Sequence, residues 1–177
     1  MLKLIGLALF VLTLLPMAGI AETPSASTAQ AEIDNEHHEQ VAAIEQVMKQ
    51  YHEAVVSHNG AALSALFLPD ANLWLSVLTD RAYEGAQAKG AKDPKVKVGS
   101  YRDFAKVVSS TPKTFDPEHS NVVIHTDGTI AAVYFDFVFN IDGKVENRGS
   151  ETWQLVNTAN GWRIAAITYS SDPAALQ

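Results

Sequence analysis

The sequence contains no cysteine among its 177 residues. Disulfide bonds and thiolate chemistry are therefore excluded, and the stability of the folded chain must come from an apolar core. Basic residues are few, because 13 Lys and Arg stand against 20 Asp and Glu, which gives a formal net charge of −7. An acidic surface repels phosphate backbones, so nucleic acid is not an expected partner.

Long apolar runs are also lacking, apart from one at the N-terminus. The charged start Met1-Leu2-Lys3, the apolar segment 4–20 and the small residues of Gly19-Ile20-Ala21 predict a signal peptide over residues 1–21. Pro16 interrupts the run, which argues against a membrane anchor of about 20 apolar residues. Cleavage removes one lysine and no acid, leaving 12 basic and 20 acidic residues and a net charge of −8. We expect a periplasmic or secreted protein with no membrane partner after cleavage.

Residues 22–36 are mostly Ser, Thr, Ala, Pro and Glu, with almost nothing large to bury, which predicts a disordered linker. Order is expected to begin near His37, in a single domain over residues 37–172. An amphipathic helix comes first, because apolar side chains recur at three- and four-residue spacing: Val41, Ile44, Val47, Met48, Tyr51 and Val55. We expect this helix to end at Asn59-Gly60 in a left-handed cap.

The next segment predicts a short helix over 61–67 and a strand over 73–78. Residues 79–99 are mostly Gly, Ala, Lys and Asp, so they are expected to form a mobile flap. Ser100 is a helix-capping residue in front of a third amphipathic helix, which Thr111-Pro112 would close.

The last third of the chain carries the strongest structural signal. Asp127-Gly128, Asp142-Gly143 and Asn160-Gly161 separate runs of β-branched and aromatic residues, and such pairs supply the positive φ angles of tight hairpins. Four antiparallel strands are therefore predicted between residues 120 and 170. The expected fold is α+β, with N-terminal helices packed on a curved, mostly antiparallel sheet that forms a cone with a pocket.

The order of elements resembles the nuclear transport factor 2-like superfamily, also called SnoaL-like or cystatin-like. The segments 44–54, 61–71 and 149–156, with Gly161-Trp162-Arg163-Ile164 and Tyr169-Ser170, carry the resemblance, which covers residues 40–171 and is nearest to the branch named for lumazine binding. The resemblance implies a cone-shaped scaffold that hosts isomerases, dehydratases, cyclases and proteins without chemistry, so it does not imply one activity. Its ketosteroid-isomerase members work with a Tyr and two carboxyls in an apolar pocket. This chain has Tyr51, Asp136 and Glu151, but these do not align residue by residue with that motif, so no role is carried over.

Asp136 and Glu151 are the acids that interrupt apolar strands. Alternation along the strand places Asp136 opposite the phenylalanines, so it is expected to face outward. A two-residue turn at Asp142-Gly143 pairs Glu151 with Tyr134, and a three-residue turn pairs it with Val133 on the phenylalanine face. If Asn160-Gly161 is a two-residue turn, Glu151 shares the face of Trp153, Leu155, Ile164 and Ser170, and this face is expected to point inward. Glu151 is then either a pocket residue or a structural acceptor for a hydroxyl such as that of Ser170.

Complete catalytic and cofactor motifs are absent. His52-Glu53 begins an H-E-x-x-H string, but position 56 is Val56, so the histidines are expected to be solvated surface residues and no metal site is predicted. The segment from Gly85 to Lys92 has the wrong spacing for a phosphate loop and lacks a following Ser or Thr. No Ser lies in a G-x-S-x-G motif, and no cofactor is expected.

Aromatic residues and one acid supply the predicted lining of the pocket: Tyr51, Trp74, Phe104, Glu151 and Trp153. The predicted function is binding of a small apolar or aromatic molecule by an exported protein that forms a homodimer. One alternative is an isomerase, dehydratase or cyclase that uses Glu151 and Tyr51 for acid–base catalysis, and another is a structural dimer with a vestigial pocket. A buried carboxyl with a raised pKa in an open cavity favours the enzyme, a purely apolar lining favours binding, and the lack of a cavity favours the structural role.

Overall fold

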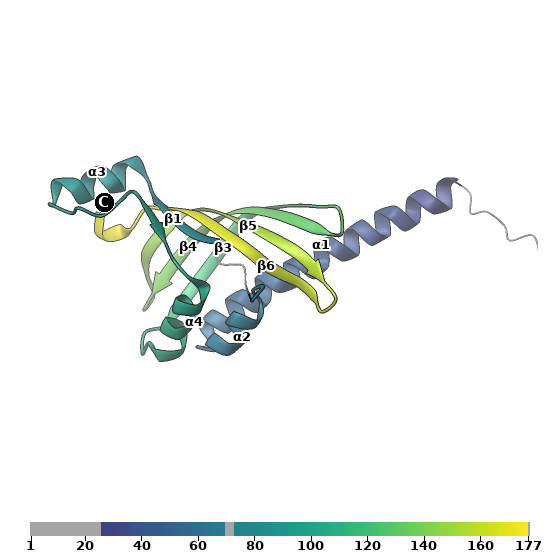
Figure 1. The fold of residues 1–177 in the computed structure, drawn as a ribbon, viewed down its shortest axis with the longest axis horizontal. Helices are drawn as coiled ribbons and strands as arrows, with labels where there is room; N and C mark the ends of the chain where they lie inside the picture. The colour runs from purple at the N-terminus through teal and green to yellow at the C-terminus, as the bar shows by residue number, and fades with distance from the viewer. Residues whose placement is uncertain (1–25, 70–72, 177) are drawn as a thin grey trace, which may run out of the picture.

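The computed structural model describes residues 26–69 and 73–176, so the predicted signal peptide lies outside the described residues. The fold is α+β, as predicted, with helices packed on one mixed sheet (Figure 1). The elements in chain order are α1 (Ala26–Val56), α2 (Gly60–Ala65), β1 (Leu73–Leu78), α3 (Asp80–Ala88), β2 (Val96–Val98), α4 (Tyr101–Ser110), β3 (Phe115–Thr126), β4 (Ile130–Ile141), β5 (Lys144–Thr158), β6 (Gly161–Ser171) and the 3₁₀ turn η1 (Ala174–Leu176).

The sheet has six strands in the order β2-β1-β6-β5-β4-β3. The predicted meander is confirmed, since β3 to β6 pair antiparallel in sequence order, and β1 adds to β6 in parallel. At the β4–β5 turn, Asp142 and Gly143 have φ angles of 52° and 72°, the pair of left-handed residues that a tight hairpin requires.

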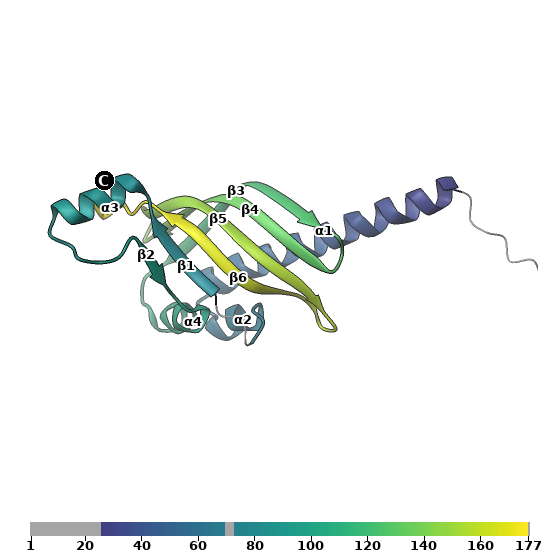
Figure 2. The ribbon, with the colours of Figure 1, turned by 45° about the horizontal axis from the view of Figure 1, so that its top comes forward.

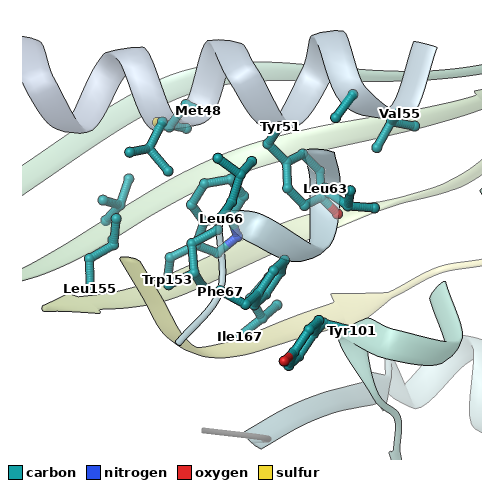
Figure 3. Packing of buried hydrophobic residues seen from close by; sticks show 14 of the residues in the cluster. Met48, Tyr51, Val55, Leu63, Leu66, Phe67, Tyr101, Trp153, Leu155 and Ile167 are labelled. Carbon is teal, nitrogen blue, oxygen red and sulfur yellow. The ribbon is translucent and has the colours of Figure 1, made fainter. Parts of the chain in front are cut away.

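Helix α1 runs along one face of the sheet, and α2 and α4 lie beside its C-terminal half (Figures 1 and 2). The core forms where these helices meet the inner face of β4, β5 and β6. In Figure 3 Tyr51 points from α1 toward the sheet, with Trp153 of β5 and Leu63 of α2 close by. The inner face of β4 carries the predicted phenylalanine row, of which Phe135 is completely buried. The helices therefore close one side of a bent sheet, which is the frame of the pocket.

The first helix differs from the prediction at both ends. It begins at Ala26, so residues 26–36 of the predicted linker are helical, and its N-terminal part extends past the sheet (Figure 1). Residues 26–36 include three Ala and two Glu, which favour helix. At the other end His58, with φ 58°, is the left-handed residue, and Asn59 caps α2 by accepting a hydrogen bond from the Ala62 N–H. The bounds of the domain, 37–172, stay a prediction.

The prediction of a mobile flap over residues 79–99 is wrong. The segment forms α3 and the short strand β2, which pairs with β1. Thr79 caps α3 by accepting a hydrogen bond from the Ala82 N–H at 3.2 Å, and Ala82 and Ala86 form its buried face. Because α3 buries only two small alanines, a pattern of large apolar residues does not reveal it in the sequence.

The third helix is confirmed, because Ser100 accepts a hydrogen bond from the Arg102 N–H and α4 ends at the predicted Thr111. Among the helices of the described segments, none combines the length and the apolar character needed to cross a membrane.

Candidate functional site

A cavity of about 350 Å³ opens between α1, α4 and the inner face of the sheet. Its volume is at the lower end of the range of about 300 to 1,000 Å³ that is typical of small-molecule sites. The cavity joins aromatic side chains with a few polar groups, and its lining residues are Tyr51, Trp74, Gly99, Ser100, Asp103, Phe104, Val107, Pro117, His119, Phe137, Phe139, Asn147, Glu151 and Tyr169. The predicted pocket is therefore present, on the inner side of the sheet.

Glu151 reaches the cavity because of the strand register. It pairs with Phe135 on β4 and with Tyr169 on β6, so its side chain is on the inner face. The β4–β5 turn has two residues, but a bulge after Phe139 shifts the ladder by one position, so both predicted partners, Tyr134 and Val133, are wrong. The inward orientation itself is correct.

The neighbour of Glu151 on β6 also differs from the expectation. Gly161 pairs with Thr158, so the two turn residues are Ala159 and Asn160 rather than Asn160 and Gly161, and a register shift between Gln154 and Leu155 then places Tyr169, rather than Ser170, opposite Glu151. The Ser170 hydroxyl instead accepts a hydrogen bond from the Ser150 N–H at 2.9 Å. The alternative in which Glu151 is a structural acceptor for Ser170 is therefore wrong.

The environment of Glu151 changes its acidity. Burial raises the pKa of this carboxyl to about 7, because the charged form loses its hydration, while the hydrogen bond from Trp153 acts in the opposite direction. The Trp153 Nε1–H donates to Glu151 Oε1 at 2.5 Å. Both the acid and the carboxylate are therefore populated near neutral pH, as proton transfer requires.

Tyr51, on α1, lines the same cavity as Glu151. Its ring lies 5.0 Å from that of Trp153 between centroids, and its side chain is buried. Burial, followed by the charges of Glu151 and Tyr169, holds the pKa of Tyr51 well above 10, so its hydroxyl stays protonated and can donate a hydrogen bond. Within the part of the chain that the structure describes, no protein group is hydrogen-bonded to this hydroxyl.

His119 is a cavity residue that the sequence reasoning missed, since the histidines were expected to be solvated. It lies on β3, with ring centroids 4.5 Å from Phe135 and 6.1 Å from Tyr51. Burial, with the nearby His52, lowers the pKa of His119 to about 4, so the imidazole is neutral at pH 7. The available signal was the period-two pattern of Phe115, Pro117 and His119, which points three alternate residues inward.

The aromatic part of the lining is a continuous wall across three elements. Phe104 of α4 lies between Trp74 of β1, at 5.5 Å, and Phe139 of β4, at 6.2 Å between ring centroids. Trp153 is completely buried and does not line the cavity, but it contacts two residues that do, Glu151 and Tyr51. Of the five predicted lining residues, Tyr51, Trp74, Phe104 and Glu151 line the cavity and Trp153 supports it.

Asp136 is on the opposite face of the sheet, as predicted. Its carboxylate accepts hydrogen bonds from Asn121 at 2.9 Å and from the Ser150 hydroxyl at 2.8 Å. These donors lower the pKa of Asp136 and keep it ionised. It therefore takes no part in the cavity. Among the residues that the structure places, no three His, Asp or Glu side chains gather as metal ligands would.

Solved structures of other proteins share the fold of this chain. No known family profile and no curated protein matches the sequence. A candidate scytalone dehydratase from Novosphingobium aromaticivorans is 16% identical over 78% of this chain and 88% of its own, with a TM-score of 0.59. A protein from the same organism, described as NTF2-like with a cystatin-like fold, is 13% identical over 89% and 96% of the two chains, with a TM-score of 0.57.

A candidate dehydratase of the NTF2-like family from Streptomyces avermitilis is also similar, at 19% identity over 83% of this chain and 100% of its own, with a TM-score of 0.53. The chain thus has the nuclear transport factor 2-like, cystatin-like fold that the sequence resemblance implied. At these identities the likeness extends to the fold alone, and one fold supports many activities.

Proposed function

We propose that the protein is an enzyme that moves a proton on a small, largely apolar or aromatic substrate, in an isomerisation or a dehydration. The observation that carries this proposal is the Glu151 carboxyl, which faces a cavity of about 350 Å³ and has a pKa raised to about 7. A carboxyl buried for packing alone gains nothing from facing a cavity, whereas a general base needs both access to substrate and a pKa near the working pH.

The geometry assigns a role to each polar group. Glu151, as the carboxylate, takes a proton from a carbon next to a carbonyl group; the C–H bond breaks, an O–H bond forms on Glu151, and the electron pair moves to the carbonyl oxygen. The Tyr51 hydroxyl, which is protonated and points into the same cavity, donates a hydrogen bond to that oxygen. Glu151 then returns the proton to another carbon, or to a hydroxyl that leaves as water.

Binding without chemistry is the second candidate. The aromatic wall of Trp74, Phe104 and Phe139 supports it, because such a wall holds a flat apolar ring whether or not a reaction follows. The third alternative, a dimer with a vestigial pocket, loses support because the cavity has the volume of a small-molecule site.

Hydrogen–deuterium exchange into a ketone tests proton transfer without knowledge of the natural substrate. 2-Tetralone, an uncharged bicyclic ketone with acidic C–H groups, is incubated in D₂O buffer near neutral pH and followed by proton NMR. The wild-type protein is expected to accelerate exchange above buffer, and Glu151→Gln to lower the protein-dependent rate by about 10²-fold or more. Glu146→Gln is the control, because Glu146 is on the same strand but exposed and outside the cavity.

Equal protein-dependent rates for wild type and Glu151→Gln would contradict the catalytic proposal. Exchange at the buffer rate, with 2-tetralone bound in a calorimetric titration, would leave binding as the function.

We also propose, from the sequence, that the protein is exported and forms a homodimer. Within the superfamily, we propose that it is nearest to the branch named for lumazine binding. The signal pattern of residues 1–21 supports a periplasmic or secreted location. Tyr134 and Val123, which are about half exposed and paired across β3 and β4, support an additional contact surface on the outer face of the sheet.

A further inference from the structure

The charges around the cavity are of one sign. Two carboxyl groups line it, Glu151 at its inner wall and Asp103 on α4, and none of the described lining residues is Lys or Arg. His119 is neutral at pH 7 and adds no positive charge. Lys106 forms an ion pair with Asp103 at 3.0 Å, but it is exposed and borders a different groove on the other side of α4.

We propose that this cavity selects uncharged ring molecules and excludes anions of the same shape. This inference rests on the proposed function and names the substrate class of the same site. An anion that enters the cavity loses hydration and meets no cation in return, while Glu151 and Asp103 repel it.

A cationic ligand does not suit the proposed chemistry either. An ammonium group next to Glu151 would pair with the carboxylate and lower its pKa, and a carboxylate held in such a pair is a weaker base. An uncharged substrate leaves Glu151 to exchange its proton with the reacting carbon alone.

The aromatic wall adds a requirement of shape. Phe104 is flanked by Trp74 and Phe139 at 5.5 and 6.2 Å, with ring planes inclined by 45° and 61°, so the wall offers both faces and edges of aromatic rings to a flat ring. The volume of about 350 Å³ leaves room for one or two fused rings rather than a long chain. The single polar group of such a ring would lie at the Glu151 and Tyr51 end.

A matched pair of probes separates charge from shape. Naphthalene-2-sulfonamide and naphthalene-2-sulfonate have the same ring and nearly the same outline, but only the sulfonate is charged at pH 8. In calorimetric titrations at pH 8 the sulfonamide is expected to bind at least tenfold more tightly than the sulfonate. Equal affinities, tighter binding of the sulfonate, or no binding of either probe would overturn the inference.

Two lysine variants test whether the cavity itself is the source of the selectivity. Val107 lines the cavity and is 48% exposed, so Val107→Lys places a cation at its edge. Val98 is 78% exposed and outside the lining, so Val98→Lys adds the same charge elsewhere. Val107→Lys is expected to reduce the preference for the sulfonamide at least threefold, and Val98→Lys to leave it unchanged.

An equal effect of the two variants would overturn the inference, because net charge would then explain the preference. The deuterium-exchange experiment fails or succeeds separately. A preference for the sulfonamide without Glu151-dependent exchange would refute the proposed catalysis and leave the charge selection of the cavity intact.

Discussion

The indole Nε1–H of Trp153 donates a hydrogen bond of 2.5 Å to Oε1 of Glu151, which precedes it by two residues on the same face of β5. This contact joins a completely buried aromatic residue to an acid of the cavity wall. The hydrogen bond favours the charged carboxylate, whereas burial favours the neutral acid. The pKa of about 7 is the balance of these two influences.

Trp153→Phe removes the hydrogen bond that lowers the pKa of Glu151, so this pKa is expected to rise above about 7. Carbon-13 NMR titration of labelled glutamate carboxyls measures this directly. The loss of buried volume should also cost about 1 to 3 kcal/mol of unfolding free energy. Trp162→Phe is the control, because Trp162 is also buried but donates to Gln40, away from Glu151. An unchanged Glu151 titration in Trp153→Phe would show that the hydrogen bond has no influence on the acid.

Glu151→Gln is expected to change how stability depends on pH. The pKa of Glu151 is raised from 4.5 in the unfolded chain to about 7 in the fold, so its contribution to stability is fully present below about pH 4.5 and is lost as the pH rises through about 7. The loss is at most about 3.5 kcal/mol, at about 1.4 kcal/mol for each tenfold change in proton affinity. Glutamine does not ionise, and its Oε1 can still accept the hydrogen bond from Trp153.

Urea denaturation at pH 4.5 and pH 8 measures this difference. The stability of Glu151→Gln relative to the wild type should increase between the two pH values, while Glu146→Gln should follow the wild type at both. A constant difference between Glu151→Gln and the wild type would show that Glu151 titrates normally and lies in water.

Tyr51→Phe separates a functional hydroxyl from a structural one. Since no described protein group bonds this hydroxyl, its removal is expected to change the free energy of unfolding by less than about 1 kcal/mol. The deuterium exchange of 2-tetralone should fall by about 10²-fold or more, because the developing charge on the substrate oxygen loses its donor. Tyr101→Phe is the control, since the Tyr101 hydroxyl donates to the Pro69 carbonyl at 3.2 Å outside the cavity. A large loss of stability with unchanged exchange would mean that Tyr51 only packs the core.

The fold was largely predictable from local signals. Asp142-Gly143 and the neighbouring turns set the hairpins, and the stripe through Ile44 and Tyr51 set the first helix, because these patterns depend on residues close together in the sequence. The helix α3 was not predictable by the same means. Its buried face consists of two alanines, and α3 packs against the C-terminal turn η1, which lies far away in the chain.

The sequence allowed us to predict which face of the sheet each acid occupies, but not which residues it contacts. Alternation correctly placed Glu151 inside and Asp136 outside. The partners of Glu151 depend on bulges after Phe139 and Gln154, and no residue type in the sequence announces either bulge. His119 was missed for a different reason, since a histidine in a strand is usually polar surface, and only its place behind Pro117 reveals that it faces inward.

Gly99 controls the width of the cavity through Trp74. A Cβ at Gly99 would lie 2.8 Å from Trp74 Cδ1, which is too close for two non-bonded carbon atoms, and the Gly99 N–H also donates to the Trp74 carbonyl at 2.7 Å. In Gly99→Ala the indole must therefore move, and the open cavity beside it gives it space. The displaced indole would then narrow the cavity beside Phe104. Calorimetry with naphthalene-2-sulfonamide should show at least tenfold weaker binding, with a change in unfolding free energy of no more than about 1 to 3 kcal/mol.

Gly90→Ala is the control. A Cβ at Gly90 meets nothing within 4 Å but φ is +85°, so this variant is expected to cost about 1 kcal/mol of stability and to leave probe binding unchanged. If Gly99→Ala bound the probe as tightly as the wild type, Trp74 would not form part of the surface that holds the ring.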